Sequence, residues 1–327
     1  MKVAFAGSFA AHMVEPVRAL RSIPCTLVAA DDAGILRHLP DAEVLVSMGF
    51  SAAMADAAPR LRLVQVPGAG LDRVEISALR HGVRLANAYG HDIGIAEYII
   101  GAMIALSRSF ASVDASLRQG HWHSQFAVGA EAPPLWPELA GSTLGILGFG
   151  RIGQALARRA VAFDMRICAV RRHPDPTPPD GVDFVGGPDQ LDDVLACADY
   201  LAVTVALSSE TRGLMDAARI AAMKPGSVLV NVARGEVFDE TALFEALASH
   251  RLGGAALDVW YRYPSGPGPT TPSTLPFHTL PNVLMTPHVS GWTEGMLDSR
   301  ARLIATNIER AARGEEPLNA VSITAPT

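Results

Sequence analysis

The segment TLGILGFGRIG, residues 143–153, limits the possible folds more than any other part of the sequence. A β-prone run leads into Gly148, Gly150 and Gly153, which have the spacing G-x-G-x-x-G, and a helical pattern over residues 152–163 follows. The spacing alone is a weak signal, but a strand before it and a helix after it are the context that phosphate binding needs. The three glycines allow a tight turn, a close approach of the backbone to a pyrophosphate, and close packing of helix on strand. The segment therefore predicts a dinucleotide at a helix N-terminus, against the alternative of a glycine turn without a ligand.

The end of the next predicted strand, residues 166–170, indicates which dinucleotide is bound. Arg171 and Arg172 stand there, about 20 residues beyond the glycines, where the adenosine ribose is inspected. An acid would repel a 2′-phosphate, whereas two arginines could clamp it through charge-assisted bonds. The pattern favours NADP(H) over NAD(H), with solvated loop charges as the alternative. Arg151 and Ile152, which precede the third glycine, are also predicted to contact the cofactor.

The rest of the chain predicts two α/β domains with parallel sheets. At 327 residues the chain is longer than one hydrophobic core usually supports. Short β-rich runs alternate with stretches long enough for a crossover, first over residues 2–87 and again over residues 143–287. A composition of 49% apolar and 18% charged residues argues against extended disorder.

Three segments set the predicted domain boundaries. Residues 92–108 are apolar on nearly all faces, which predicts a long buried helix with Asp92 as its N-cap. Residues 118–141 contain three prolines and predict a linker or an arm on a neighbouring surface. Residues 296–313 have one apolar helical face, stop at Gly314, and are expected to return to the first domain. The predicted domains are residues 1–108 with 296–327, and residues 109–295.

Charge, cysteine content and hydropathy argue against several classes of protein. A formal net charge of −6 gives no electrostatic case for nucleic acid or an anionic membrane as the main partner. Three scattered cysteines lack metal-ligand spacing and suit a reducing compartment. No apolar run has transmembrane length, and the chain opens on a strand-like run without the features of a targeting segment. We therefore expect a cytoplasmic protein with a small-molecule ligand, no metal and no membrane contact.

Three stretches at predicted strand ends contain side chains suited to acid–base chemistry. They are NVARGEVFDE, ALDVWYRYP and MTPHVSGWTEG, which contain Arg234, Asp258 and His288. Taken singly, these residues have ordinary alternatives: a surface ion pair, a cap and a polar turn residue. Because open α/β sheets collect ligands at the carboxyl ends of their strands, the three stretches and the glycine loop predict one site.

Several long motifs in order give the chain a resemblance to the D-isomer-specific 2-hydroxyacid dehydrogenase family. They are VPGAGLDRVE, IAEYIIGAMIALSR, ELAGSTLGILGFGRIG, NVARGEVFDETAL, GAALDVW and LPNVLMTPHVSG, and they cover nearly the whole chain. The resemblance implies a Rossmann dinucleotide-binding domain inserted into a flavodoxin-like substrate domain that the C-terminal helix completes. It also implies an active site in the cleft and a homodimer.

The resemblance also implies roles for single residues. Arg234 matches the arginine that holds the substrate carboxylate and carbonyl, a role that suits a guanidinium fork. His288 matches the acid/base that exchanges a proton with the substrate oxygen. Asp258 matches a position that contacts the nicotinamide carboxamide. Ala69 and Gly70 match the loop whose backbone N–H groups receive the substrate carboxylate.

Tyr263 departs from the family pattern, which places a glutamate five residues beyond the aspartate to pair with the catalytic histidine. A carboxylate would stabilise imidazolium, whereas a neutral phenol could only orient the ring by a hydrogen bond. Three interpretations stay open: Tyr263 orients His288; another acid such as Glu294 replaces the glutamate, or His288 acts without one; or catalysis is feeble and the protein binds a nucleotide as a sensor.

The sequence thus predicts an oxidoreductase that transfers a hydride between NADPH, or NADH, and a small 2-oxo acid such as glyoxylate or hydroxypyruvate. The alternative is a catalytically weak dinucleotide-sensing regulatory or scaffold protein on the same fold. A further departure is the proline-rich loop over residues 264–281, which is longer than the family norm. It is expected either to reshape substrate access or an oligomer contact, or to be a tolerated surface insertion.

Overall fold

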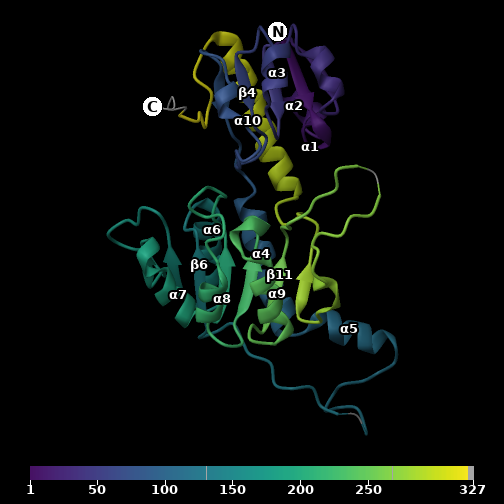
Figure 1. Cartoon of the computed structure of the whole chain (residues 1–327), viewed down its shortest axis with the longest axis vertical. Helices are drawn as coiled ribbons and strands as arrows, with labels where there is room; N and C mark the ends of the chain where they lie inside the picture. Colours follow the sequence, from purple (N-terminus) through teal and green to yellow (C-terminus); the bar gives the residue numbers. More distant parts are fainter. Residues whose placement is uncertain (130, 267, 323–327) are drawn as a thin grey trace. The chain divides into compact units, whose positions relative to one another are not determined.

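The computed structural model describes residues 1–129, 131–266 and 268–322, and the chain forms two compact units. The first unit contains residues 1–91 and the chain from Trp292 onward, and the second contains Asp92–Gly291. The second unit is therefore inserted into the first, as predicted (Figure 1).

The first unit is built on a five-stranded parallel sheet of order β2-β1-β3-β4-β5, which is the flavodoxin-like order. Its strands are β1 (Lys2–Ala6), β2 (Thr26–Ala30), β3 (Val44–Ser47), β4 (Leu63–Gln65) and β5 (Arg84–Ala86). Its helices are α1 (Gly7–Ala11), α2 (Val14–Leu20), α3 (Ala52–Ala57) and α10 (Glu294–Arg313), with short 3-10 helices at Gly34–His38 and Ile76–Ala78.

Helix α10 closes one face of this sheet together with α1 and α2 (Figure 1). The Thr293 side chain accepts from the N–H of Met296 and caps the helix start, and Gly314 ends it with a φ of 74°. That left-handed conformation favours glycine. Ile304 and Ile308 of α10 are fully buried against the strands, so the predicted return of the last helix to the first unit is confirmed.

The second unit is built on a seven-stranded parallel sheet of order β12-β11-β10-β9-β6-β7-β8. Counted along the chain this order is 3-2-1-4-5-6-7, the doubly wound Rossmann arrangement. The strands are β6 (Thr143–Leu147), β7 (Arg166–Val170), β8 (Phe184–Gly186), β9 (Tyr200–Val203), β10 (Val228–Asn231), β11 (Gly254–Leu257) and β12 (Val283–Met285). The sequence patterns predicted all of them except the three-residue edge strand β8.

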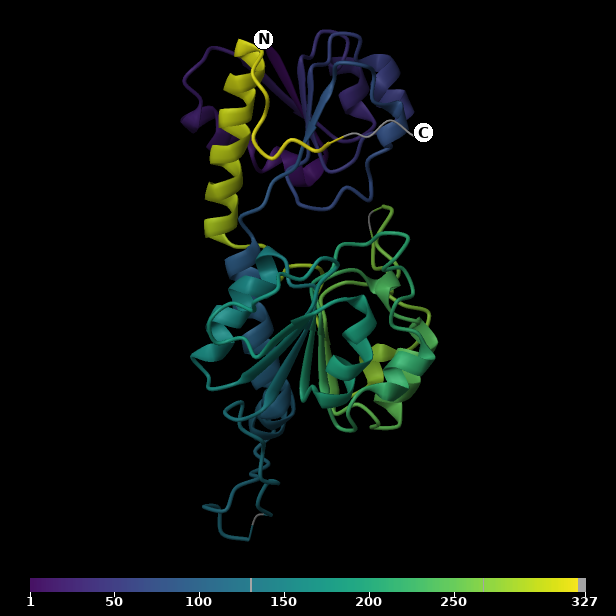
Figure 2. The ribbon, with the colours of Figure 1, turned by 90° about the vertical axis from the view of Figure 1, so that its left-hand side faces the viewer.

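Helices cover both faces of this sheet (Figure 2). The helices α4 (Asp92–Ser107) and α6 (Arg151–Val161) lie on one face, and α7 (Leu191–Cys197), α8 (Ala217–Ala222) and α9 (Glu240–Ala248) lie on the other. Short 3-10 helices occur at Pro188–Gln190, Gly235–Val237 and Phe277–Thr279. Because both faces are covered, every residue of β6 and β9 is buried, as expected of parallel strands.

Helix α4 is part of the second unit, whereas the predicted boundaries at residues 108 and 296 would place it in the first. Its residues Ile95, Ile99 and Met103 belong to the same buried cluster as Leu156 of α6. The boundaries of the compact units therefore fall at residues 91 and 291. Asp92 is the first residue of α4, so it lies within the first turn and is not the predicted N-cap.

A projecting segment follows α4. The helix α5 (Phe110–Arg118) is followed by irregular chain in which Trp122, Phe126 and Leu135 are strongly exposed. This agrees with the predicted arm-like segment. No single described helix is long and apolar enough to cross a membrane; the bent pair α4 and α5 meets the length and composition test, and α4 is a core helix.

Candidate active site

The glycine loop lies between β6 and α6, where the strand order of the second unit reverses. Gly148 has a φ of +105°, and a Cβ there would lie 2.8 Å from the backbone nitrogen of Val205. At Gly153 a Cβ would lie 2.5 Å from the carbonyl oxygen of Gly148, but at Gly150 it would meet no atom within 4 Å. The loop is therefore closed on its inner side and open where a pyrophosphate would approach.

The start of α6 suits an anion. Gly150 is the N-cap, and no side chain caps the helix, so its first-turn N–H groups point out of the helix end without a capping side chain. Arg151 and Ile152 are the first two helical residues. Thr204 donates to the carbonyl oxygen of Gly148 at 2.6 Å and fixes the loop from the neighbouring strand end. These residues fit a bound dinucleotide.

The two arginines predicted to read the ribose lie directly after β7, and both form ion pairs. Arg171 donates to Asp175 at 2.8 Å, and an oxygen of Glu210 lies 2.5 Å from Arg172. Both carboxylates are largely exposed, at 76% and 66% of the side-chain surface. Exposed pairs of this kind contribute about 0–1 kcal/mol, so a phosphate can displace them.

Arg234 follows β10 in a loop that Asn231 organises. The Asn231 side chain accepts from the N–H of Ala233 and donates to the carbonyl oxygen of Arg234, both at 3.0 Å. Nη1 of Arg234 donates to the carbonyl oxygen of Ala233 at 2.7 Å. A Cβ on Gly235 would lie 2.7 Å from the backbone of Trp260, so this glycine permits the β10 and β11 loops to pack closely. The guanidinium is thereby held at the carboxyl edge of the sheet.

Asp258 has a structural task that the sequence did not indicate. Its side chain is fully buried; one oxygen accepts from Thr286 at 2.6 Å and from the N–H of Val289 at 2.8 Å, and the other accepts from the N–H of Ser290 at 2.8 Å. The carboxylate therefore ties down the loop on both sides of His288. The predicted contact with the nicotinamide carboxamide stays a prediction beside this observed role.

Two further side chains support this loop, and the sequence analysis missed both. Tyr98 of α4 shares a 2.7 Å hydrogen bond with Thr286, and the indole N–H of Trp260 donates to the carbonyl oxygen of Thr286 at 2.9 Å. Burial raises the pKa of Tyr98 to about 12. The available signal was the threonine just before Pro287, because a hydroxyl at a strand end commonly bonds a neighbouring loop.

His288 and Tyr263 are in contact, as the position of the tyrosine predicted. The Tyr263 hydroxyl and Nδ1 of His288 are 2.9 Å apart, and the ring centroids are 5.8 Å apart. His288 has a φ of +59°, a left-handed conformation that is uncommon for a residue other than glycine and is typical of functional sites. The Asp258 hydrogen bonds hold the residues that follow His288 in this strained loop.

Ala69 and Gly70 belong to the first unit. They lie in the loop after β4, at the carboxyl end of that strand, and the Asn87 side chain donates to the carbonyl oxygen of Ala69 at 3.0 Å. The loop is half-buried and ordered by this bond. Their predicted contact with the substrate carboxylate stays a prediction.

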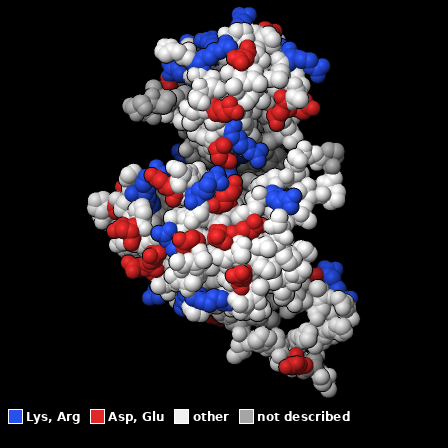
Figure 3. Space-filling view, in the orientation of Figure 1, with Lys and Arg blue, Asp and Glu red and all other residues white. Residues whose placement is uncertain are grey.

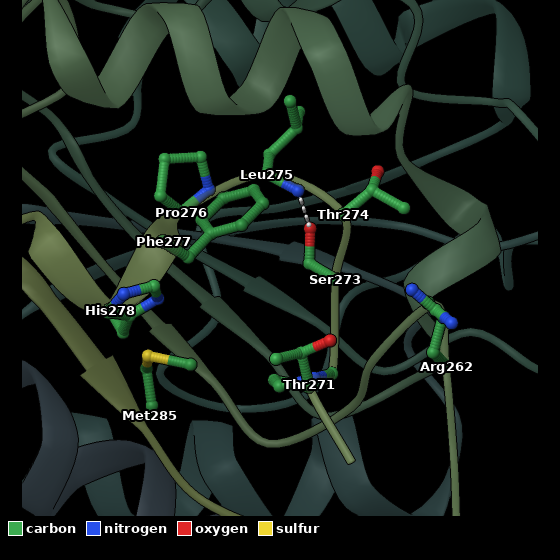
Figure 4. Close-up of a pocket in the computed structure, with 10 residues that line it drawn as sticks. Arg262, Thr271, Ser273, Thr274, Leu275, Pro276, Phe277, His278 and Met285 are labelled. Carbon is green, nitrogen blue, oxygen red and sulfur yellow. Dashed lines mark hydrogen bonds between the residues drawn. The ribbon is translucent and has the colours of Figure 1, made fainter.

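The proline-rich loop is folded on the second unit and contains a shallow cavity of about 310 Å³ (Figure 4). Phe277 is 1% exposed and packs edge to face on Phe244, while Ser273 accepts from the N–H of Leu275 and donates to Glu240. None of the predicted site residues lines the cavity. The described part of the loop from Thr271 to Leu280 therefore packs on the second unit, and its cavity is separate from the glycine loop and His288.

Charges of both signs are interspersed over the face shown in Figure 3, which displays no extended basic patch. Among the described residues, no group of three His, Cys, Asp or Glu side chains is placed to hold a metal ion. The arginines discussed above are thus not part of an extended basic patch on the face shown in Figure 3.

A doubly wound parallel sheet with a glycine loop at its switch point defines the second unit as a Rossmann dinucleotide-binding unit. The family described as "D-isomer specific 2-hydroxyacid dehydrogenase, NAD binding domain" matches residues 100–290. The chain belongs to the D-isomer specific 2-hydroxyacid dehydrogenase family, as its motifs predicted.

Relatives of known name agree with this assignment. The glyoxylate reductase of Thermococcus onnurineus is 33% identical over 296 residues, which cover 86% of this chain and 84% of that protein. The D-3-phosphoglycerate dehydrogenase of Methanocaldococcus jannaschii is 34% identical over 88% of this chain but only 53% of its own length, so the chain spans about half of that relative. A solved 2-hydroxyacid dehydrogenase from Ketogulonicigenium vulgare is 31% identical, with a TM-score of 0.79 over 98% of each chain.

Proposed function

We propose that this chain is a nicotinamide-dependent reductase of small 2-oxo acids, which in reverse oxidises D-2-hydroxy acids. The observation that carries the proposal is the His288–Tyr263 pair, which lies with Arg234 and the glycine loop at the carboxyl edge of one parallel sheet. The relative that is named as a glyoxylate reductase supports a small substrate. Glyoxylate and hydroxypyruvate are the first substrates to test.

The residues of the site divide the chemistry between them. A bound nicotinamide cofactor supplies the hydride. Arg234 binds the substrate carboxylate and polarises the carbonyl, and its charge stabilises the oxygen as negative charge develops. His288 gives a proton to that oxygen. Asp258 keeps the His288 loop in place. A contact of the Ala69 and Gly70 N–H groups with the substrate carboxylate stays a prediction.

NADPH is the proposed cofactor. Arg171 and Arg172 supply positive charge at the ribose end of the site, and the end of β7 contains no acid that would repel a 2′-phosphate. The acids that pair with them, Asp175 and Glu210, are exposed and release the guanidinium groups at little cost. Charge-assisted bonds to a phosphate are stronger than these surface pairs.

A homodimer is the proposed assembly, because the segment after α5 exposes several apolar side chains and contains few charges (Figure 3). Exposed apolar surface of this kind marks protein–protein contacts. A cytoplasmic location also belongs to the proposal: Cys25, Cys168 and Cys197 are free thiols, which suits a reducing compartment.

The second candidate function is a dinucleotide sensor with little turnover, favoured by the Tyr263 phenol at Nδ1 of His288, at the position where the family pattern has a glutamate. A spectrophotometric screen separates the two: purified protein is mixed with NADPH or NADH and a panel of 2-oxo acids. We expect oxidation of NADPH. Cofactor binding without oxidation by any substrate would contradict the enzyme. In the active protein, Arg234→Ala raises KM and lowers kcat together, because the group acts in both the ground and transition states.

A further inference from the structure

The Tyr263 hydroxyl is within hydrogen-bond distance of a backbone N–H and of His288. The backbone N–H of Trp260 donates to the Tyr263 oxygen at 3.4 Å. Trp260 is only 4% exposed, and a buried N–H requires an acceptor. The phenol oxygen is therefore an acceptor on that side. The hydroxyl keeps its one hydrogen for donation, and Nδ1 of His288, 2.9 Å away, can accept it when that nitrogen is unprotonated.

A hydrogen bond donated by Tyr263 to Nδ1 would determine which ring nitrogen of His288 carries the proton. A nitrogen that accepts a hydrogen bond is unprotonated, so a neutral ring with Nδ1 as acceptor has its proton on Nε2. A carboxylate at position 263 would impose the opposite arrangement, because a carboxylate only accepts and would draw a proton onto Nδ1. The substitution of a phenol for the expected acid thus reverses the polarity of the bond.

We propose that Tyr263 holds neutral His288 as the Nε2–H tautomer and acts with it as a proton relay. The relay rests on the proposed function, whereas the tautomer does not. When the carbonyl oxygen becomes an alkoxide, the Nε2–H bond breaks and an O–H bond forms on the substrate. In the same event the Tyr263 O–H bond breaks and an Nδ1–H bond forms, so the imidazole stays neutral.

The negative charge then lies on the Tyr263 oxygen, which the Trp260 N–H stabilises. Tyr263 is 39% exposed, so water can return the proton. No electrons move apart from the hydride pair. A phenol is suited to this task because its ordinary pKa of about 10 lies far below the pKa of an aliphatic alcohol, the conjugate acid of the alkoxide. Tyr263 is thus a positioning residue that acts through His288.

Other charged groups lie on the loops beside this pair. On the β11 loop, the oxygens of Asp258 accept from Thr286 and from the N–H groups of Val289 and Ser290. On the β10 loop, Arg234 donates to the carbonyl oxygen of Ala233, and Glu236 lies 3.7 Å from Arg212. Arg262 precedes Tyr263 and is exposed. Tyr263 contributes the phenol that lies at Nδ1.

The first test is a nuclear magnetic resonance spectrum of the protein with ¹⁵N-labelled histidine, recorded above the pH at which the ring protonates. Long-range ¹⁵N–¹H couplings distinguish the two tautomers, and His288→Gln identifies the signal among ten histidines. We expect Nε2–H in the wild type and loss of that preference in Tyr263→Phe. An Nδ1–H wild type, or an unchanged Tyr263→Phe spectrum, would overturn the tautomer.

Tyr261→Phe is the matched control for this spectrum. Tyr261 is two residues away, and its hydroxyl makes only a 3.5 Å bond to the carbonyl oxygen of Phe238. Removal of that hydroxyl leaves the His288 signal unchanged. A change in the control equal to that in Tyr263→Phe would assign the effect to the loop as a whole and would overturn the role of Tyr263.

The second test measures the reduction rate in mixtures of H₂O and D₂O. A relay moves two protons, so we expect a curved dependence on deuterium content in the wild type and a straight one in Tyr263→Phe, with kcat lowered about tenfold to a hundredfold. Straight lines for both proteins would overturn the relay. In Tyr263→Glu we expect the falling limb of the pH profile at higher pH, because a carboxylate stabilises imidazolium; an unmoved limb would also overturn it. Failure of all turnover contradicts the proposed function, while the tautomer spectrum still tests the inference.

Discussion

Each unit contains one strand at which the order of its parallel sheet reverses, β1 in the first unit and β6 in the second. After β1, Gly7 has a φ of +82°, and a Cβ there would lie 3.1 Å from a carboxylate oxygen of Asp32. After β6, a Cβ on Gly150 would meet no atom within 4 Å, and Arg171 directly follows the neighbouring strand β7. The loops after the two reversal strands thus differ: an acid lies against the first glycine of one, and the second glycine of the other has open space.

The difference shows that sheet topology creates a place for a ligand but does not choose one. Phe9 lies two residues beyond Gly7, as Gly150 lies two residues beyond Gly148. The Phe9 ring packs against Trp292, with 5.4 Å between the ring centroids. A dinucleotide needs a close backbone approach and a helix end with positive potential. Only the loop after β6 combines both among the described residues.

The largest expected effect comes from giving the second loop the side chain of the first. In Gly150→Phe the ring occupies the space for the pyrophosphate, so cofactor affinity falls about a hundredfold or more, as expected for losing charge-assisted hydrogen bonds. Cofactor fluorescence titration measures it. Gly101→Phe is the control, because a Cβ there also meets nothing within 4 Å. Equal affinity in Gly150→Phe and wild type would place the cofactor elsewhere.

The next largest effect is on the free energy of unfolding. It compares removal of the buried acid Asp258 in the second unit with removal of the exposed acid Asp32 in the first. Asp258→Ala leaves the buried N–H of Ser290 and the Thr286 hydroxyl without their acceptor, so stability falls by about 2–3 kcal/mol. Asp32→Ala changes an exposed residue and costs at most about 0.5 kcal/mol. Urea unfolding checks both values. Similar losses would show that Asp258 does not hold the His288 loop.

A third prediction concerns the charge at the end of β7, which is reversed to match the acid that follows β2. Arg171→Asp places an acid after β7, as Asp31 stands after β2, and it should repel a 2′-phosphate. The preference for NADPH over NADH in kcat/KM then falls by about tenfold to a hundredfold, because one charge-assisted contact is lost. A wild-type enzyme that already prefers NADH would refute the assignment of the cofactor.

The smallest expected effect on stability concerns Asp199, which lies at the amino end of β9 in the second sheet. Asp199 accepts from the N–H of Thr143 at 2.8 Å and from Lys224 at 2.5 Å; burial opposes the effect of these bonds, but they hold the pKa of Asp199 below its ordinary value. Its stabilisation is therefore present above the unfolded-state pKa and is lost as pH falls through the folded-state value. Lys224→Met should cost less than about 1 kcal/mol near neutral pH, and less in acid. Unfolding at both pH values measures this, and a loss that grows in acid would contradict the assignment.

The sequence predicted most of the fold because its periodic signals are local. The β-rich runs and the helix ending at Gly314 were found from patterns that neighbouring residues set. Edge strand β8 was missed because its three residues end in Gly186 and are followed by Gly187 and Pro188, a pattern typical of turns. The unit boundary was misplaced because a helix apolar on nearly all faces does not show which core it joins.

The candidate site was predicted in part for the same reason. Gly148, Gly150 and Gly153 were chosen from their spacing, Arg234 and His288 from their places after strands, and Tyr263 from its departure from the family pattern. Asp258 was predicted to contact the cofactor, and its role in holding the His288 loop was missed. That role depends on the N–H groups of Val289 and Ser290, which lie about thirty positions away in the sequence. Tyr98 was missed because it lies in a helix far from this loop in the sequence, although Thr286, its partner, was a signal in the loop itself.

By itself, the sequence determined the dinucleotide loop, the parallel α/β class and the positions of the arginine and histidine, since each depends on residue types at short spacing. The tertiary structure decided how these residues act. It placed Asp258 behind the His288 loop, gave Gly150 its open side, and brought the Tyr263 hydroxyl to Nδ1 of His288. Hydrogen-bond direction and local space depend on contacts between distant segments, and only the folded chain brings those together.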